Sequence, residues 1–155
     1  MLSEIIPQKL YVSDEHSACH YQWLDQLNIK SLLRLDKDAI YRKSWDEQGQ
    51  RTLGTVHLID GGVGNSVESY LLAIDFIKTR ILYNQTPVLV YCMAGQSRSP
   101  CICALFLYSA GLCKTFDEAM QYMRSKHAFT STKEEIIEFV KQYVIPQIKV
   151  SSEPI

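Results

Sequence analysis

The sequence lacks a long apolar run, a large net charge and paired cysteines, and each absence narrows its function. No stretch reaches the ~18 apolar residues of a membrane-spanning helix, and we find neither a secretion signal nor a lipidation motif. The net charge of −1 gives no reason to expect a nucleic acid or a membrane as a partner. Five cysteines without a C-x-x-C pair predict free thiols in a reducing compartment. We therefore expect a cytoplasmic protein, with a nuclear location left open.

Length and composition are those of one globular domain. The 155 residues, 46% of them hydrophobic, suffice for a buried core. We expect a single domain over residues 1–150, followed by a frayed tail over residues 151–155. Strand-like and helix-like patterns alternate along the chain, without internal repeats. This alternation predicts an α/β domain with a central, mostly parallel sheet of about five strands, flanked by helices on both faces.

The hydrophobic pattern also predicts where the elements lie. The expected strands are residues 10–12, 29–35, 55–59 and 88–91. The expected helices are residues 14–28, 66–82, 99–110, 115–126 and 132–144. Ser66, Thr115 and Thr132 are the expected N-caps, the last two in capping boxes, and Gly111 is the expected stop of the central helix. The charged segment 36–51 is expected to lie on the surface.

Residues 88–100 are the most informative stretch. An apolar strand ends at Cys92, five small or flexible residues follow, and Arg98 then precedes an apolar helix. A strand, a tight loop and a helix direct backbone N–H groups and the positive end of the helix at one point. Such a point binds anions, most naturally phosphate. The residues expected to bind phosphate are Met93, Ala94, Gly95, Gln96, Ser97 and Arg98.

The residue types in this stretch suit a phosphate site that contains a nucleophile. A free cysteine has a pKa of roughly 8.5, and a helix N-terminus lowers it to about 3.5–7.5, so Cys92 is the expected nucleophile. Gly95 permits a positive φ or a close approach of the backbone to a ligand. The planar fork of Arg98 can hold two phosphoryl oxygens. Ser99 can donate a hydrogen bond to the sulfur when the sulfur becomes the leaving group.

The segment from Cys92 to Ser99 resembles the signature of the cysteine-dependent protein tyrosine phosphatases, which is Cys, five residues, Arg, then Ser or Thr. Its Ala-Gly-x-Ser-Arg-Ser form is similar to the dual-specificity branch. The resemblance extends in element order over roughly residues 4–145. It implies the phosphatase fold, a cysteinyl-phosphate intermediate, and no metal or other cofactor.

The leaving oxygen of a phosphate ester needs an acid to protonate it. Asp60 follows an expected strand and opens a Gly-rich loop, and sites in α/β sheets lie at the carboxyl ends of strands. In the family the acid lies on a loop upstream of the nucleophile, and Asp60 stands 32 residues before Cys92. The resemblance therefore assigns the acid to Asp60. The alternative is that Asp60 only starts a turn, and Asp75, inside an expected helix, is a weaker candidate.

Two positions depart from the family pattern. Tyr91 stands where the family usually has a histidine that braces the loop. Tyr91 can donate a hydrogen bond but carries no positive charge, so we expect activity that is reduced or shifted to higher pH. Thr132 stands near the place of an asparagine that supports the phosphate loop. Thr132 either takes over this support through its hydroxyl or only caps the last helix.

The loop also bears on the substrate. Its variable residues carry no positive charge, which favours a phosphoprotein over a polyphosphorylated lipid. The short chain implies a shallow pocket that admits phosphotyrosine and also phosphoserine or phosphothreonine. We expect a monomer whose partner is a phosphoprotein substrate, with no nucleic acid or membrane bound. Two alternatives stay open: a phosphopeptide-binding pseudophosphatase, and a phosphatase of RNA 5′ ends or small phosphoesters.

Other histidines and cysteines do not predict a functional site. His16, Cys19 and His20 share a helical face but lack a fourth ligand, so we expect no metal site there. Cys101 is expected in the core. His127 is expected to be an exposed loop residue.

Overall fold

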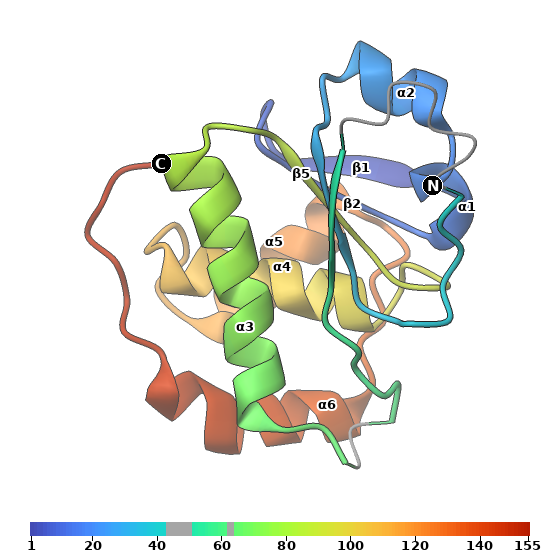
Figure 1. Ribbon diagram of the computed structural model, residues 1–155. Coiled ribbons are helices and arrows are strands. Elements are labelled where there is room, and N and C mark those ends of the chain that lie inside the picture. The colour runs from blue at the N-terminus through green and yellow to red at the C-terminus, as the bar shows by residue number, and fades with distance from the viewer. Residues whose placement is uncertain (43–50, 62–63) are drawn as a thin grey trace.

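The structure, a computed structural model, describes residues 1–42, 51–61 and 64–155. In these residues a five-stranded sheet has the order β1-β2-β5-β3-β4 (Figure 1). Only β1 and β2 pair antiparallel, whereas the other neighbours are parallel. The strands are β1 Leu2–Ile6, β2 Leu10–Ser13, β3 Ser31–Arg34, β4 Thr52–Thr55 and β5 Val88–Tyr91. The predicted α/β class with a mostly parallel sheet is confirmed.

Six α-helices surround the sheet in the described chain. They are α1 Glu15–Ala18, α2 Tyr21–Gln26, α3 Val67–Lys78, α4 Arg98–Ser109, α5 Phe116–Lys126 and α6 Glu134–Phe139. α3 continues as a π-helical turn over Thr79–Tyr83, and α6 continues over Val140–Val144 and a 3₁₀ turn over Ile145–Gln147. None of the described helices combines the length and apolar content needed to cross a membrane.

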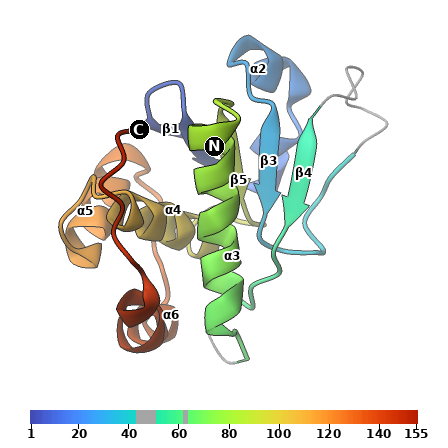
Figure 2. The ribbon, with the colours of Figure 1, turned by 60° about the vertical axis from the view of Figure 1, so that its left-hand side comes forward.

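The two faces of the sheet bury different sets of side chains. Because successive side chains of a strand point to opposite faces, Leu33 and Val90 pack with α3 to α6, whereas Leu32 and Leu89 pack against α1 and α2. Figure 2 shows α3 to α6 together on one side of the sheet. The larger of the two cores therefore lies under these four helices.

α4 is the central helix of the larger core. Its residues are buried with the exception of Tyr108, and Cys101 and Cys103 are completely inaccessible. Burial raises the pKa of the Cys101 thiol to about 12, so this thiol behaves as a small apolar group. The helix ends before Gly111, whose φ of +74° fits its predicted role as the stop. A helix packed this tightly gives its first turn a fixed position.

Several sequence predictions need correction. Residues 14–28 form two helices, because the chain turns between α1 and α2. β1 was missed; it is the edge strand of a hairpin with β2. The strand expected at 55–59 lies at Thr52–Thr55, and the chain beyond it follows the exit of β3, where the N–H of Leu58 donates to Leu35 O.

The segment 36–51 was expected on the surface, and this was wrong at both ends. Asp36 and Arg51 are 6% and 9% exposed. Both charges are buried with partners: Asp36 with Arg98, and Arg51 with Asp25 and the backbone oxygen of Ile29. Residues 43–50 of this segment lie outside the described residues.

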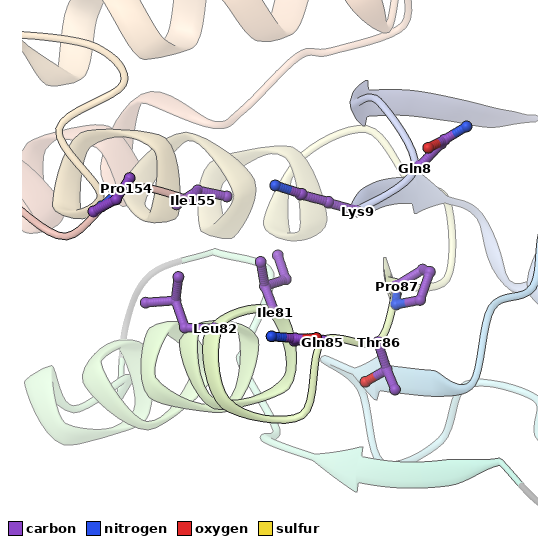
Figure 3. A pocket seen from close by; sticks show the side chains of 9 residues that line it. All are labelled: Gln8, Lys9, Ile81, Leu82, Gln85, Thr86, Pro87, Pro154 and Ile155. Carbon is purple, nitrogen blue, oxygen red and sulfur yellow. The ribbon is translucent and has the colours of Figure 1, made fainter.

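The tail over residues 151–155, expected to fray, lies back against α4. The N–H of Ser151 donates to Ser109 O at 2.7 Å, and Ile155 packs on the larger core. The tail closes one side of a cavity of about 360 Å³, shown in Figure 3. The cavity is lined by Gln8, Lys9, Ile81, Leu82, Gln85, Thr86, Pro87, Pro154 and Ile155. Lys9 and Pro87 precede β2 and β5, so this cavity lies at the amino ends of the strands.

Candidate active site

The opposite end of the sheet, at the carboxyl ends of the parallel strands, holds the predicted phosphate site. β5 ends at Tyr91, which is level with Ser13 of β2 and Arg34 of β3. The phosphate loop, residues 92–98, starts there and runs into α4. In an α/β sheet this is the edge where ligands bind.

The carbonyl oxygens of the phosphate loop point away from its centre. Four of them accept hydrogen bonds from other segments: Met93 O from Glu15 N (3.2 Å), Gly95 O from His127 Nε2 (2.8 Å), Gln96 O from Ser131 N (2.6 Å) and Ser97 O from Thr132 Oγ1 (2.9 Å). Within the described chain, no N–H from Met93 to Arg98 has an acceptor. Backbone N–H groups left without an acceptor in one tight loop are the donors that an anion site needs, so the loop has the properties expected of the predicted phosphate site.

Gly95 lets the loop lie against the end of β2. Its φ is +69°, and a Cβ at this position would stand 2.7 Å from Asp14 N and 2.8 Å from the carbonyl carbon of Ser13. Both neighbours are backbone atoms that cannot rotate away. Gly95 is therefore required by conformation and by space, as the sequence predicted.

Cys92 and Ser99 meet at the start of α4. The Cys92 Sγ lies 3.2 Å from the Ser99 Oγ, and both residues are buried. A serine hydroxyl can donate to a sulfur anion. The structure thus brings together the predicted nucleophile and the residue predicted to ease its departure.

One edge of the Arg98 guanidinium is held by the protein. Its Nη1 donates to Asp36 Oδ2 and to Leu58 O, each at 2.8 Å. Its Nε is buried without a hydrogen-bond partner among the described residues, and the residue is only 8% exposed. The held edge fixes the plane of the guanidinium, so its Nε–H remains available for an anion.

Asp36 anchors Arg98, and the sequence analysis did not identify it. Burial opposes its ionisation, but the N–H of Asp38 and the Arg98 guanidinium outweigh burial and lower the pKa of Asp36. His57 Nδ1 lies 3.7 Å from Asp36 and accepts the N–H of Lys37. The available signal was an acidic residue two positions beyond β3, at the carboxyl edge of the sheet.

Asp60 lies on the acid loop, residues 58–65, of which 62 and 63 are outside the described residues. Its Oδ2 lies 3.1 Å from Lys133 Nζ, which also donates to Asp60 O at 2.9 Å. Its Oδ1 is buried and has no partner among the described residues. Because Leu58 O binds Arg98, the acid loop begins in contact with the phosphate loop.

Tyr91 and Thr132 were both expected to support the phosphate loop; the structure confirms this for Thr132, and for Tyr91 the expectation is wrong. The buried Tyr91 hydroxyl donates to Ile40 O at 3.1 Å, on the face of the sheet that packs against α1 and α2. Burial raises the pKa of Tyr91 far above its ordinary value, so the phenol stays protonated. Thr132 donates to the phosphate loop at Ser97 O. Its predicted capping role is wrong, because α6 begins after Lys133 without a side-chain cap.

His127 was expected on the surface, and it is 2% exposed. Its Nε2 lies 2.8 Å from Gly95 O and its Nδ1 lies 2.7 Å from Ser3 Oγ. A carbonyl oxygen only accepts, so Nε2 carries a proton and donates it to the phosphate loop. No local pattern signals this contact, because it depends on how β1, α5 and the loop come together.

Comparisons with known proteins agree with this geometry. The family model of the dual specificity phosphatase catalytic domain matches residues 10–145. A tyrosine-to-histidine variant of human DUSP28 superposes with a TM-score of 0.82 at 13% identity, over 94% of this chain and 95% of that one. The Yvh1 phosphatase domain from Chaetomium thermophilum gives 0.82 at 15% identity, over 98% and 100% of the two chains.

Human tyrosine phosphatase-like serine/threonine/tyrosine-interacting protein gives a TM-score of 0.79 at 18% identity, over 96% of this chain and 98% of that one. Identities this low show a shared fold alone. No curated protein matches the sequence. Since the family model spans most of the chain, the protein belongs to the dual specificity phosphatase catalytic domain family, within the cysteine-dependent protein tyrosine phosphatases.

Proposed function

We propose that the protein is an active protein phosphatase that hydrolyses phosphotyrosine, and also phosphoserine or phosphothreonine, through a cysteinyl-phosphate. The observation that carries the proposal is the phosphate loop, whose carbonyl oxygens are bound from outside. Among the described residues this leaves its N–H groups and the Nε of Arg98 without acceptors, and we infer that they bind one anion beside the Cys92 sulfur. A site that only bound phosphate would need neither the sulfur nor an acid.

In the first step the Cys92 thiolate attacks phosphorus in line with the leaving oxygen. The S–P bond forms while the P–O bond to the substrate breaks, and the oxygen takes its electron pair. Asp60 gives its proton to this oxygen, so a neutral phenol or alcohol departs. The loop N–H groups and Arg98 hold the equatorial oxygens, which is the electrostatic stabilisation that phosphoryl transfer requires.

In the second step water attacks the cysteinyl-phosphate. The Asp60 carboxylate takes a proton from the water, the new P–O bond forms, and the S–P bond breaks. The sulfur leaves as a thiolate, and the Ser99 hydroxyl at 3.2 Å donates a hydrogen bond to it. Inorganic phosphate is released, and Asp60 again holds the proton with which the cycle began.

The substrate assignment rests on the loop side chains. Three of the variable loop residues are exposed, Met93, Ala94 and Gln96, and Ser97 is buried; none of the four is cationic. A ligand with several phosphates would meet no second cation from these residues. A phosphorylated side chain of a protein needs only the one phosphate site.

The alternative function is that of a phosphopeptide-binding protein with weak or no activity, and the surroundings of Tyr91 favour it. Its hydroxyl is bonded to Ile40 O and gives no hydrogen bond to the phosphate loop. It also brings no positive charge near Cys92. The presence of Asp60 close to the loop argues for the enzyme.

The test is phosphate release from phosphotyrosyl and phosphothreonyl peptides, with a chelator present. We expect Cys92→Ser to abolish turnover but to keep peptide binding. Cys113→Ser, a half-buried cysteine outside the site, is the matched control and should behave as the wild type. Full turnover by Cys92→Ser would refute the proposal. Binding without turnover by the wild type would favour the phosphopeptide-binding alternative.

A further inference from the structure

We infer that Lys133 is a positioning residue that holds Asp60 for proton transfer, an inference that rests on the proposed function. Lys133 is the only residue in the described chain whose backbone and side chain bind the two loops separately. Its N–H donates to Ser97 Oγ of the phosphate loop at 3.2 Å. Its ammonium donates to Asp60 O at 2.9 Å and lies 3.1 Å from Asp60 Oδ2.

The backbone of Lys133 has a fixed place relative to the nucleophile. The two residues before it also bind the phosphate loop: Ser131 N donates to Gln96 O, and Thr132 Oγ1 donates to Ser97 O. Three consecutive residues therefore hold the same turn that carries Cys92 and Arg98. The lysine stem starts from this fixed point and reaches the acid loop.

The two carboxylate oxygens of Asp60 stand in different surroundings. Oδ2 accepts from the ammonium, whereas Oδ1 is buried without a partner among the described residues. An ammonium has only donors, so Oδ2 cannot at the same time give a proton to Lys133. The proton for the leaving oxygen therefore belongs on Oδ1, and Lys133 determines the orientation of the carboxyl group.

The contact contributes little to folding. The side chains of Lys133 and Asp60 are 49% and 36% exposed, and ion pairs this accessible add little to stability. A methionine at position 133 keeps the backbone N–H that binds Ser97. Loss of the ammonium therefore tests the orientation of Asp60 without removing the support of the phosphate loop.

Substrates whose leaving groups differ in their need for a proton measure how well the acid works. Nitrophenolate is a stable anion and departs with little help, whereas phenolate needs a proton as it leaves. For Lys133→Met we expect kcat/KM to fall about tenfold on phenyl phosphate and less than about twofold on p-nitrophenyl phosphate. Lys133→Arg, which keeps the charge and the donors, should restore most of the activity on phenyl phosphate.

Lys141→Met is the matched control. Lys141 pairs with Asp117 at 2.8 Å with a side-chain exposure of 48%, close to that of Lys133, but it touches neither loop. We expect wild-type kcat/KM on both substrates. An equal loss on both substrates in Lys133→Met, or no loss on either, would overturn the positioning role.

Asp60→Asn separates this inference from the proposed function. If Asp60 is the acid, Asp60→Asn shows a larger leaving-group dependence than Lys133→Met, and adding Lys133→Met to it causes no further loss. If Asp60→Asn shows no leaving-group dependence, Asp60 is not the acid and the proposed mechanism fails at that step. If Asp60→Asn shows the leaving-group dependence but the double variant loses further activity, the positioning role of Lys133 is refuted and the role of Asp60 as the acid stands.

Discussion

The phosphate loop and the acid loop are held in different ways. The carbonyl oxygens of the phosphate loop bind groups from the start of α1 and from the connection between α5 and α6, far away in the sequence. The described residues of the acid loop are closed from within the loop: Asn65 Oδ1 accepts the N–H of Ile59, and Asn65 Nδ2 donates to Ile59 O. Among the described residues of the acid loop, Leu58 and Asp60 tie it to the phosphate loop, through Arg98 and Lys133.

This difference fits the work that the proposed mechanism gives to each loop. A nucleophile and an anion site gain most from donors that need no reorganisation during the reaction, and contacts from many segments provide that rigidity. An acid must first give and then take a proton, at two different oxygens. The described part of the acid loop relies on local contacts for its shape, whereas the phosphate loop relies on distant ones.

Among variants that keep the nucleophile, the largest expected effect is that of Arg98→Lys. A lysine offers a point charge instead of a planar fork, so it cannot bind Asp36 and Leu58 while also directing a donor at phosphate. We expect kcat/KM on phosphotyrosyl peptide to fall by about 10²–10³-fold, as for the loss of one preorganised donor. Arg124→Lys, at an exposed site on α5, is the control. A fall of less than about tenfold would contradict the assigned role of Arg98.

A pair of glycines compares the two loops directly. Gly95→Ala places a Cβ against backbone atoms at 2.7 Å and 2.8 Å with φ at +69°, whereas Gly61→Ala meets nothing within 4 Å. We expect Gly95→Ala to lower the free energy of unfolding by about 2 kcal/mol and activity by about 10²-fold. Gly61→Ala should change stability by less than about 0.5 kcal/mol. Urea unfolding and peptide kinetics measure both effects, and similar values for the two variants would contradict the comparison.

His127 tests whether distant contacts position the phosphate loop. His127→Ala removes the donor to Gly95 O and the partner of Ser3. We expect a loss of about 1–3 kcal/mol in stability, since a buried carbonyl oxygen loses its partner, and about a tenfold weaker inhibition by inorganic phosphate. His127→Gln, which keeps a donor, should recover part of the phosphate affinity. Unchanged inhibition in His127→Ala would show that the loop holds its shape without this contact.

The sequence predicted those parts of the fold and site that depend on local chemistry. Cys92, Gly95 and Arg98 were identifiable because a strand, a tight loop and a helix create an anion site within a few residues. The N-caps Ser66 and Thr115 were identifiable for the same reason, and both accept the expected backbone N–H. Each of these interactions joins residues that are close in the sequence.

What the sequence could not predict depends on topology. Asp36, His127 and Lys133 reach the site because β3 lies beside β5 and the connection from α5 to α6 crosses the phosphate loop. A periodic pattern describes one element at a time and does not show which element ends meet. For the same reason β1 was not predicted, because this edge strand is recognisable by its pairing with β2 and not by its own pattern.

The last expected effect is a pH dependence of stability at Asp36, measured on unfolding and not on turnover. Its pKa is lowered in the folded protein, so it contributes stability above the unfolded pKa of about 3.9 and loses it as pH falls through the folded pKa. Asp36→Asn cannot ionise, and at neutral pH we expect it to be about 1.5–3 kcal/mol less stable, the value of a hydrogen bond to a charged group. This difference should shrink as pH falls below about 4, because the unfolded wild-type carboxyl is protonated there before the folded one, and it is lost as pH falls through the folded pKa.

Urea unfolding of the wild type and of Asp36→Asn at several pH values measures this difference. The contributions of the other carboxyl groups to the free energy of unfolding cancel in it, because both proteins carry these groups. A difference that stays constant down to pH ~2 would mean that Asp36 acts through packing and not through its charge. The anchor of Arg98 would then not depend on an ion pair. Loss of activity in Asp36→Asn at neutral pH, with Arg98 unchanged, would link the fixed plane of the guanidinium directly to phosphate binding.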